Sequence, residues 1–464
     1  MAAIGTKKVG KDLTEGPILR KLVPFVLPIV LANLVQQLYG IVDLIVIGKF
    51  MGPTGTVGVS VGGEINDIIL PLAGAFASAG QILIAQLVGA KAEKKKEKAI
   101  GTLLSLMLFA GLFIMVVVLA LHSVFLRMLS CPAEAYGQAV NYMIITAFGI
   151  PFVMMYNAVC GVLRGMGESN RPFIFICIAA AANIVMDIIL VVPFHMEAAG
   201  TAIATLISQM ASFAAAFIFM YQRREHFGFK LSLSYLKIDG ESLKIILKLG
   251  IPQAVRSMFV RFSMFYVNSS INSYGLVVSA TNSVGNKLMS FLELYSSSFM
   301  SACSAMVGQN LGAKKHDRAL KMVWYSLGIT IGIAAVAAAL LFFFPSQMYG
   351  IFTNDPAVIE LGHVYIQMLM VHLFFSAFIA PLQGMVLGSG NSILNFIIGI
   401  IDGVICKVGF GVILAYVFNM GYLGFWWGTA FSRAIPGLIC LIYVLSGKWK
   451  NRSLFKEPPK KEET

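Results

Sequence analysis

The sequence predicts an all-α polytopic membrane protein with about twelve transmembrane helices. These helices form two six-helix bundles related by a pseudo-two-fold axis along the membrane normal. The 464 residues are 58% hydrophobic and only 12% charged, against roughly 25% charged residues in an average soluble domain. Long apolar segments recur between short polar breaks, and short motifs of the first half of the chain return in the second half.

Each apolar segment is long enough to cross a bilayer as a helix, which takes about 20 residues. In order, the predicted spans cover residues 18–48, 57–88, 99–122, 138–163, 172–193, 199–220, 244–272, 280–310, 319–344, 358–387, 392–418 and 421–446. A charged segment without a span separates the sixth from the seventh. We therefore predict a first lobe at 1–221, a cytoplasmic linker at 222–243 and a second lobe at 244–464 with a basic cytoplasmic tail.

The placement of lysine and arginine predicts the orientation of these spans. Of the 35 Lys and Arg residues, 28 lie in the N-terminal segment, after the second, fourth, sixth and eighth spans, or in the tail after the twelfth. Only Lys49 and Arg127 lie in loops on the other side. By the positive-inside rule both termini are cytoplasmic. The net charge of +13 is thus an orientation signal and does not indicate nucleic-acid binding.

The N-terminus and the cysteines exclude some other possibilities. No short apolar segment with a small-residue cleavage site precedes the first span, so we expect no removable signal peptide. Five of the six cysteines fall within predicted spans, only Cys131 lies in an outer loop, and none has zinc-ligand spacing. We expect no disulfide, no metal cluster and no bound cofactor.

The two halves share motifs at a nearly constant offset. "QLVGAK" after the second span returns as "QNLGAK" after the eighth, and "GVLRGMGES" after the fourth returns as "GMVLGSGNS" after the tenth. Pro28 in the first span corresponds to Pro252 in the seventh. Six spans per unit make the repeats parallel, an architecture that places a cavity between two bundles and permits alternating access. The alternative is a duplication without a role in transport.

Two aspartates lie inside predicted spans of the first half. Asp43 interrupts "IVDLIVIG" in the first span, and Asp187 lies at a similar depth of the fifth, both in the outer half of the membrane. A carboxylate there costs about 2.5 to 3.5 kcal/mol on insertion scales, so its presence needs a reason. Two such groups cannot both ionise cheaply, and the pair should hold a proton or a cation. The alternative is that each aspartate only caps or pairs locally.

Polar residues at helical spacing surround both aspartates, because residues one turn apart share a helix face. The candidate cation-coupling residues are Asp43, Asn183, Asp187 and Thr205, with Tyr39, Gln36 and Thr201 as neighbours. Their oxygens suit Na⁺, whereas a carboxyl that holds its proton suits H⁺. The sequence leaves both coupling ions open.

The second half does not repeat the carboxylate pair. Aligning "YVNSSI" with "IVDLIV" places Asn268 where Asp43 stands. Other ionisable residues lie in its spans: Arg256, Arg261, Lys287, Glu293, Asp402, Lys407 and Arg433. Isolated buried charges are unfavourable, so the two acids are candidate partners of Lys287 or Lys407. This polar region either serves substrate binding or gating, or only pairs helices.

The order and spacing of these motifs resemble the multidrug and toxic compound extrusion (MATE) transporters, in their bacterial DNA-damage-inducible-protein-like branch. The resemblance covers nearly the whole chain and also rests on "LPIVLANLVQQLYGIVDLIVIGKFMG", "NIVMD" and "GTAIAT". It implies that the four candidate residues form a first-lobe cation site beside Tyr39, and that the first helix bends at Pro28.

The resemblance implies a cation-coupled antiporter, not an enzyme, that exports amphipathic, often cationic compounds in exchange for inward H⁺ or Na⁺. We expect a monomer in a bacterial cytoplasmic membrane, in contact with lipids and without a nucleic-acid partner. The alternative is a lipid-linked oligosaccharide flippase of the same superfamily, which the basic second lobe favours. Other branches carry carboxylates in the seventh and tenth spans, whereas this seventh span has Arg256 and Arg261 and no acid. A membrane-embedded enzyme or receptor lacks any supporting motif.

Overall fold

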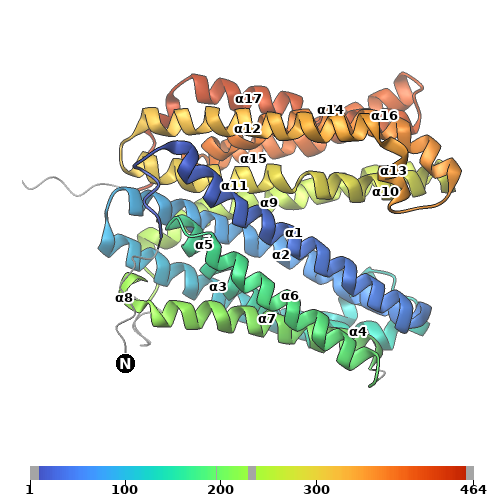
Figure 1. The fold of residues 1–464 in the computed structure, drawn as a ribbon. Helices are drawn as coiled ribbons and strands as arrows, with labels where there is room; N and C mark the ends of the chain where they lie inside the picture. The colour runs from blue at the N-terminus through green and yellow to red at the C-terminus, as the bar shows by residue number, and fades with distance from the viewer. Residues whose placement is uncertain (1–9, 195, 228–236, 456–464) are drawn as a thin grey trace, which may run out of the picture.

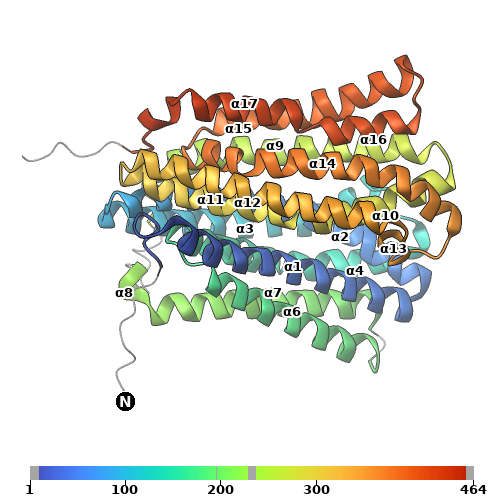
Figure 2. The same ribbon diagram turned by 45° about the horizontal axis from the view of Figure 1, so that its top comes forward.

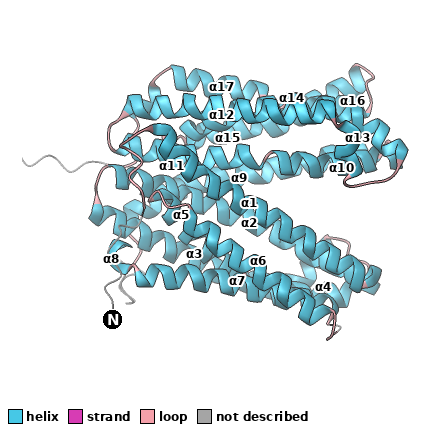
Figure 3. Ribbon diagram, in the orientation of Figure 1, coloured by secondary structure: helices cyan, strands magenta, loops and turns pink. Residues whose placement is uncertain are grey.

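The computed structural model describes residues 10–194, 196–227 and 237–455, and this part of the chain consists of helices and short loops without a strand (Figure 3). The α-helices are α1 (Ile18–Phe50), α2 (Gly52–Gly89), α3 (Glu93–Met128), α4 (Tyr136–Ala147), α5 (Ile150–Gly165), α6 (Asn170–Val191), α7 (Glu197–Gln222), α8 (Arg224–Phe227), α9 (Gly240–Asn272), α10 (Leu276–Leu292), α11 (Leu294–Gly312), α12 (His316–Phe343), α13 (Pro345–Gly350), α14 (Pro356–Gly388), α15 (Ser392–Ile400), α16 (Tyr422–Phe431) and α17 (Ala434–Leu445). Shorter pieces are the 3₁₀ helices η1 (Ala133–Ala135) and η5 (Lys448–Asn451) and the π-helices η3 (Ile401–Phe410) and η4 (Ile413–Val417).

Every predicted span coincides with one helix or with consecutive helices. Four spans consist of consecutive helical pieces: α4 with α5, α10 with α11, α15 with the two π-helices, and α16 with α17. The sequence did not predict these joints. Three of them carry a charged residue at or beside the joint, and these residues, Glu293, Asp402 and Arg433, lie in the second half.

Nine described helices are long and apolar enough to cross a membrane, or ten if α4 and α5, which meet at 44°, form one span. The two predicted spans that fall short are α9 and the pair α10–α11. Charged residues such as Arg256 and Arg261 lie along α9, and α11 contains five serines. Polar residues thus lower the hydropathy of these helices, and the count of twelve stays a prediction.

The helices form two groups that converge at one end (Figures 1 and 2). One group holds α1 to α7 and the other holds α9 to α17, and they spread apart at the end opposite α8. Each group has its own apolar core, while buried residues of α1 such as Leu22 and Phe25 pack with Phe299 and Met306 of α11. The predicted linker lies partly outside the described residues, and the lobe boundaries stay predictions.

The repeated motifs meet where the two groups converge. Gln86 Nε2 donates a hydrogen bond to the Gly388 carbonyl at 2.9 Å, and its counterpart Gln309 donates to the Gly165 carbonyl at 2.9 Å. Gln309 Oε1 also accepts from the Leu13 amide, at 3.1 Å. Equivalent glutamines of the two repeats therefore join the helix groups at this end, each donating a hydrogen bond to a backbone carbonyl of the other group.

The segments predicted to be cytoplasmic gather at the same end. Arg318 donates hydrogen bonds to the carbonyls of Glu15 and Gly16, at 3.0 and 2.7 Å, and Lys98 lies 3.3 Å from Asp239. Basic residues of this side that lie outside the described part are Lys7, Lys8, Lys230, Lys456, Lys460 and Lys461.

Candidate functional site

The two aspartates of the first half lie together, one from α1 and one from α6. Their carboxyl groups interact with each other, and Asp187 is only 1% exposed. No described group donates a hydrogen bond to Asp43 Oδ1 or to either carboxylate oxygen of Asp187. A hydrogen bond between two carboxyl groups requires one proton, and buried acceptors without donors are unfavourable. The pair therefore suits a bound proton or another cation.

Asn183 adds a further acceptor one turn before Asp187 on α6. Its Oδ1 is buried and also has no described donor. A cavity of about 350 Å³ adjoins these groups, and its lining includes Gln36, Tyr39, Asp43, Asn183 and Thr205. The predicted polar stripe of α1 thus faces the same space as the polar residues of α6 and α7. Tyr142 of α4 lines it too and is a hydrogen-bond neighbour of Thr205.

Two predicted residues lie differently from the others. Thr201 is fully buried, and its hydroxyl lies 3.8 Å from Met51 Sδ, away from the residues that line the cavity. Thr201 thus packs α7 against the end of α1, one turn from Thr205. Pro28 lies within α1, which is a continuous helix from Ile18 to Phe50. Bending at Pro28 stays a prediction.

The position equivalent to Asp43 is a neutral asparagine whose side-chain oxygen is paired. Asn268 Oδ1 accepts hydrogen bonds from Asn282 at 3.0 Å and from Asn286 at 3.1 Å. Tyr365 in turn donates to Asn286, and Trp426 donates to Asn282, each at 3.1 Å. These neutral hydrogen bonds satisfy the polar side chains and leave no acceptors comparable to those beside Asp187.

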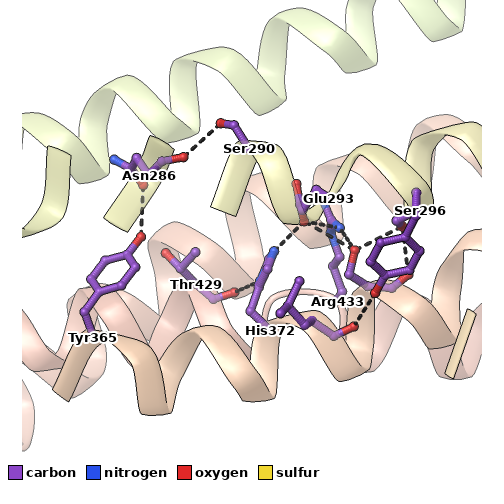
Figure 4. Close-up of polar contacts among 11 residues, drawn as sticks. Asn286, Ser290, Glu293, Ser296, Tyr365, His372, Thr429 and Arg433 are labelled. Atoms are coloured by element: carbon purple, nitrogen blue, oxygen red, sulfur yellow. Dashed lines mark hydrogen bonds and ion pairs between the residues drawn. The ribbon is translucent and has the colours of Figure 1, made fainter. Parts of the chain in front are cut away.

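A charged cluster lies at the C-terminal end of α10, about two turns after Asn286, where α10 meets α11 (Figure 4). Glu293 Oε1 lies 2.5 Å from Arg433 Nη1 and 2.6 Å from His372 Nε2. His372 Nδ1 lies 3.0 Å from the Thr429 carbonyl, which can only accept, so Nδ1 carries hydrogen. His372 of α14 thus joins Glu293 to the Thr429 carbonyl of α16.

This cluster corrects the predicted pairing of the second half. Glu293 pairs with Arg433 and His372, not with Lys287, which is exposed and has no ion pair with a described acid. Asp402, on the π-helix η3, has Lys407 as its first electrostatic neighbour, although the two are not in direct ion-pair contact. Lys287 is exposed on α10, which the sequence alone did not reveal.

Sequence reasoning missed several of these residues. His372 lies in the apolar run "MLMVHLFF", and an ionisable residue there was a signal that could have identified it. Asp67 of the second span was also passed over, and it lies 3.6 Å from Arg261, joining α2 to α9 at an exposed position. Tyr142 gave no signal, since tyrosine is common in spans. Among the described residues no group of three His, Cys, Asp or Glu side chains could hold a metal ion.

Comparisons with known proteins agree with this architecture. The MatE family profile matches residues 28–189 and 252–417, one segment in each half. The probable multidrug resistance protein YoeA of Bacillus subtilis is 26% identical over 440 residues, which cover 93% of this chain and 94% of that protein. The multidrug export protein MepA of Staphylococcus aureus is 23% identical over 434 residues, with coverages of 93% and 94%.

Solved structures show the same fold. A crystal structure of MATE in the straight conformation has a TM-score of 0.88 at 23% identity and covers 95% of this chain and 98% of that one. The bent conformation has a TM-score of 0.84 at 21% identity, with coverages of 94% and 96%. The family profile spans most of both halves, and the chain belongs to the MatE family of transporters.

Proposed function

We propose that this protein is a secondary active multidrug efflux antiporter that exports amphipathic organic compounds, often cationic, in exchange for inward H⁺ or Na⁺. The observation that carries the proposal is the pair Asp43 and Asp187, in which Asp43 Oδ1 and both Asp187 oxygens are buried without described donors, and Asp43 lines a cavity of about 350 Å³. The multidrug names of YoeA and MepA support the substrate class.

In this mechanism the ion and the substrate favour different conformations, and whether an ion is bound at the aspartate pair decides which conformation is adopted. An ion that enters from outside binds at Asp43 and Asp187 and removes the cost of the buried charge. The helices α1 and α6 that carry the pair then pack differently, and the two helix groups rock against each other. Substrate binding in the opposite state completes the exchange, because each ligand favours the arrangement that it fits better.

The orientation, location and oligomeric state belong to the same proposal. The end where α2 and α11 meet is taken as cytoplasmic, because the basic loops and the N-terminal segment gather there. The protein then opens outward in a bacterial cytoplasmic membrane and works as a monomer. Membership of the DNA-damage-inducible-protein-like branch is proposed from the order and spacing of the motifs taken together.

Purified protein in vesicles with imposed pH or Na⁺ gradients tests this function. Asp43→Asn and Asp187→Asn should each lower the rate of gradient-driven transport at least tenfold. Membrane insertion should stay intact, because an amide keeps the size of the side chain and removes only the titratable charge. Glu64→Gln is the matched control: Glu64 is an exposed acid within α2. Wild-type transport by either aspartate variant would refute the coupling assignment.

The flippase alternative has one supporting observation, the arginine side chains of the second half. Vesicles loaded with either ethidium or fluorescein distinguish the two functions. A multidrug antiporter moves at least one of these unrelated dyes when a gradient is applied. A flippase dedicated to lipid-linked oligosaccharides moves neither.

A further inference from the structure

A second and larger cavity, of about 480 Å³, lies between the two helix groups. This volume is within the range of about 300 to 1,000 Å³ typical of sites for drug-sized ligands. Residues of α1, α2 and α5 line one side, and residues of α9, α11, α14 and α15 line the other. Most polar lining residues are amides and hydroxyls. The charged ones are Arg164 and Arg256, one from each half, and no Asp or Glu lines this cavity.

Arg256 is held in place without a direct carboxylate partner. No described acid lies within ion-pair distance of it, although Asp402 is an electrostatic neighbour. Its Nε is buried and has no acceptor. The side chain lies against Gly399 of α15, where an added Cβ would stand 2.2 Å from Arg256 Cγ. A glycine at this position therefore makes room for the arginine beside the cavity.

Gln253 supplies another donor on the same face of α9. It lies one turn before Arg256, lines the same cavity and is 8% exposed. Its Nε2 is buried and has no acceptor among the described residues. Two neighbouring buried donors without acceptors are unfavourable unless water or a ligand in the cavity supplies the acceptor.

Arg164 stands across the cavity at the last turn of α5. Its Nε donates to Gln81 Oε1 at 2.9 Å, and Gln81 Nε2 donates to the Ser301 carbonyl and to Ser304, at 3.0 and 2.9 Å. This chain of hydrogen bonds fixes the guanidinium near the joined end of the two groups. No described acid lies within ion-pair distance of Arg164.

The neighbouring cluster supplies no net negative charge to this space. A cavity of about 290 Å³ contains Glu293 and Asp402 and shares Arg256 and Met300 with the central cavity. Glu293 is paired with Arg433, whereas Asp402 Oδ1 is buried without a described partner and has Lys407, Arg433 and Arg256 as its charged neighbours. These three basic residues outnumber the two acids, so the formal charge of the cluster is positive.

We propose that the central cavity binds the acidic group of an amphipathic anion, with Arg164, Arg256 and Gln253 as its donors. The inference rests on the proposed export function but changes its substrate class, from often cationic compounds to compounds with a carboxylate, sulfonate or phosphate group. Charge-assisted hydrogen bonds to guanidinium groups are strong in a low-dielectric site, whereas an organic cation there meets like charge. The same acidic chemistry occurs on an exported solute and on an anionic lipid headgroup.

The test is equilibrium binding of three dyes that share a xanthene skeleton and differ in charge: anionic fluorescein, zwitterionic rhodamine B and cationic rhodamine 6G. Fluorescence anisotropy on the purified protein in neutral detergent needs no ion gradient, so its outcome is independent of whether coupled transport works. Fluorescein should bind at least tenfold more tightly than rhodamine 6G, with rhodamine B between them. Displacement of fluorescein by phosphatidylglycerol, and not by phosphatidylcholine, would identify the lipid as the source of the acidic group.

Variants then assign the site. Arg164→Gln and Arg256→Gln should each weaken fluorescein binding by about tenfold or more, the loss expected for one charge-assisted hydrogen bond, and should not weaken rhodamine 6G binding. Gly399→Ala keeps every charge but displaces Arg256, and it should also weaken fluorescein binding. Arg256→Lys retains the charge and should retain part of the affinity, which separates the site from a folding defect.

Arg171→Gln is the matched control, because Arg171 stacks on Phe219 at 5.0 Å and does not line the cavity. It should bind fluorescein like the wild type. Equal or tighter binding of rhodamine 6G by the wild type would overturn the proposal. Unchanged fluorescein binding in both Arg→Gln variants, with each variant folded by size-exclusion chromatography, would overturn it as well.

Discussion

At the scale of single residues, two kinds of buried acid occur in this membrane protein. Neither carboxylate oxygen of Asp187 has a described donor. Glu293 Oε1, in contrast, lies 2.5 Å from Arg433 Nη1 and 2.6 Å from His372 Nε2. An acid without partners is stabilised by taking up a cation, so its charge state can change during a cycle. An acid paired with an arginine and a histidine joins the helices that supply them. Burial alone therefore does not distinguish a coupling residue from a structural one.

This difference predicts opposite effects on stability. Glu293→Gln should lower the stability of the purified protein by about 3 kcal/mol, because Arg433 loses its counter-charge in a partly buried site. Asp187→Asn should change stability little or raise it, since it removes a buried carboxyl that lacks donors. Thermal unfolding in detergent measures both, with Glu64→Gln as an exposed control. A Glu293→Gln variant as stable as the wild type would show that the ion pair of Glu293 with Arg433 contributes nothing to stability.

At the scale of helices, the ends of α2 and α11 close one end of the molecule. Each helix finishes in a glycine of the repeated motif, and each glycine lies against the backbone of the other helix. A Cβ on Gly89 would stand 1.9 Å from the Gln309 carbonyl oxygen, and one on Gly312 would stand 2.0 Å from that of Gln86. Only glycine permits this approach, which brings both glutamine side chains within reach of the opposite group.

Substitution of these glycines should loosen the joined end. Gly89→Ala or Gly312→Ala forces the two helix ends apart and should cost about 1 to 3 kcal/mol of stability, as overpacking does in a close-packed interior. Gly328→Ala in α12 is the control, since nothing lies within 4 Å of its added Cβ. Thermal unfolding of the three variants checks this expectation. Equal losses in all three would contradict the special role of the two helix ends.

The start of α9 gives a prediction on pH dependence. Asp239 caps this helix, and the pKa of its carboxyl is lowered mainly by the hydrogen bond from the Ser242 backbone N–H, with further contributions from the Ser242 hydroxyl and Lys98. A lowered pKa in the folded protein means that the ionised cap stabilises the fold above the unfolded value of about 3.9. This contribution is lost as the pH falls through the folded value.

Asp239→Ala should therefore lower stability at pH 7 by about 1 kcal/mol, the usual effect of removing an N-cap. The gap between wild type and variant should shrink between pH 5 and pH 3. Asp239→Asn keeps a good cap without the titrating charge, so it should stay near the wild type at pH 7. Melting temperatures across this pH range provide the measurement, and a gap that widens at low pH would contradict the assigned cause.

At the scale of the whole molecule, two halves with one plan carry different chemistry. The first half holds the aspartate pair beside its own cavity, while the second half holds neutral Asn268 and a charged cluster around Glu293. The central cavity between them has arginines from both halves. Repetition of the fold thus provides two similar bundles, and local substitutions within it give only the first one a site suited to a coupling cation.

The asymmetry predicts the outcome of restoring the missing acid. Asn268→Asp keeps both hydrogen bonds, because Asn282 and Asn286 donate to its oxygen. It should not create a second coupling site, since the position 223 residues after Asp187 is Phe410. The ratio of ions to substrate, measured from reversal potentials in vesicles, should stay at the wild-type value. A higher ratio would mean that one added carboxyl group is enough to form a second coupling site.

The sequence by itself determined the helix positions, the repeat and the residence in a membrane. These properties depend on local composition and on motifs that recur at a constant offset, so no tertiary contact is needed to read them. The aspartates 43 and 187 were found in the same way, because a carboxylate in an apolar span is conspicuous wherever the helix packs. Their shared depth followed from counting residues along each helix.

Only the tertiary structure decided which side chains meet. Lys287 and Arg433 are both basic residues within spans, yet Arg433 contacts Glu293 and Lys287 is exposed without an ion pair to a described acid. Thr201 and Thr205 are one turn apart, yet only Thr205 lines the cavity. The rotation of a helix about its axis and the joints between helical pieces of one span determine which neighbours a side chain contacts. Both depend on packing against neighbouring helices, which are distant in sequence and leave no periodic signal along the chain.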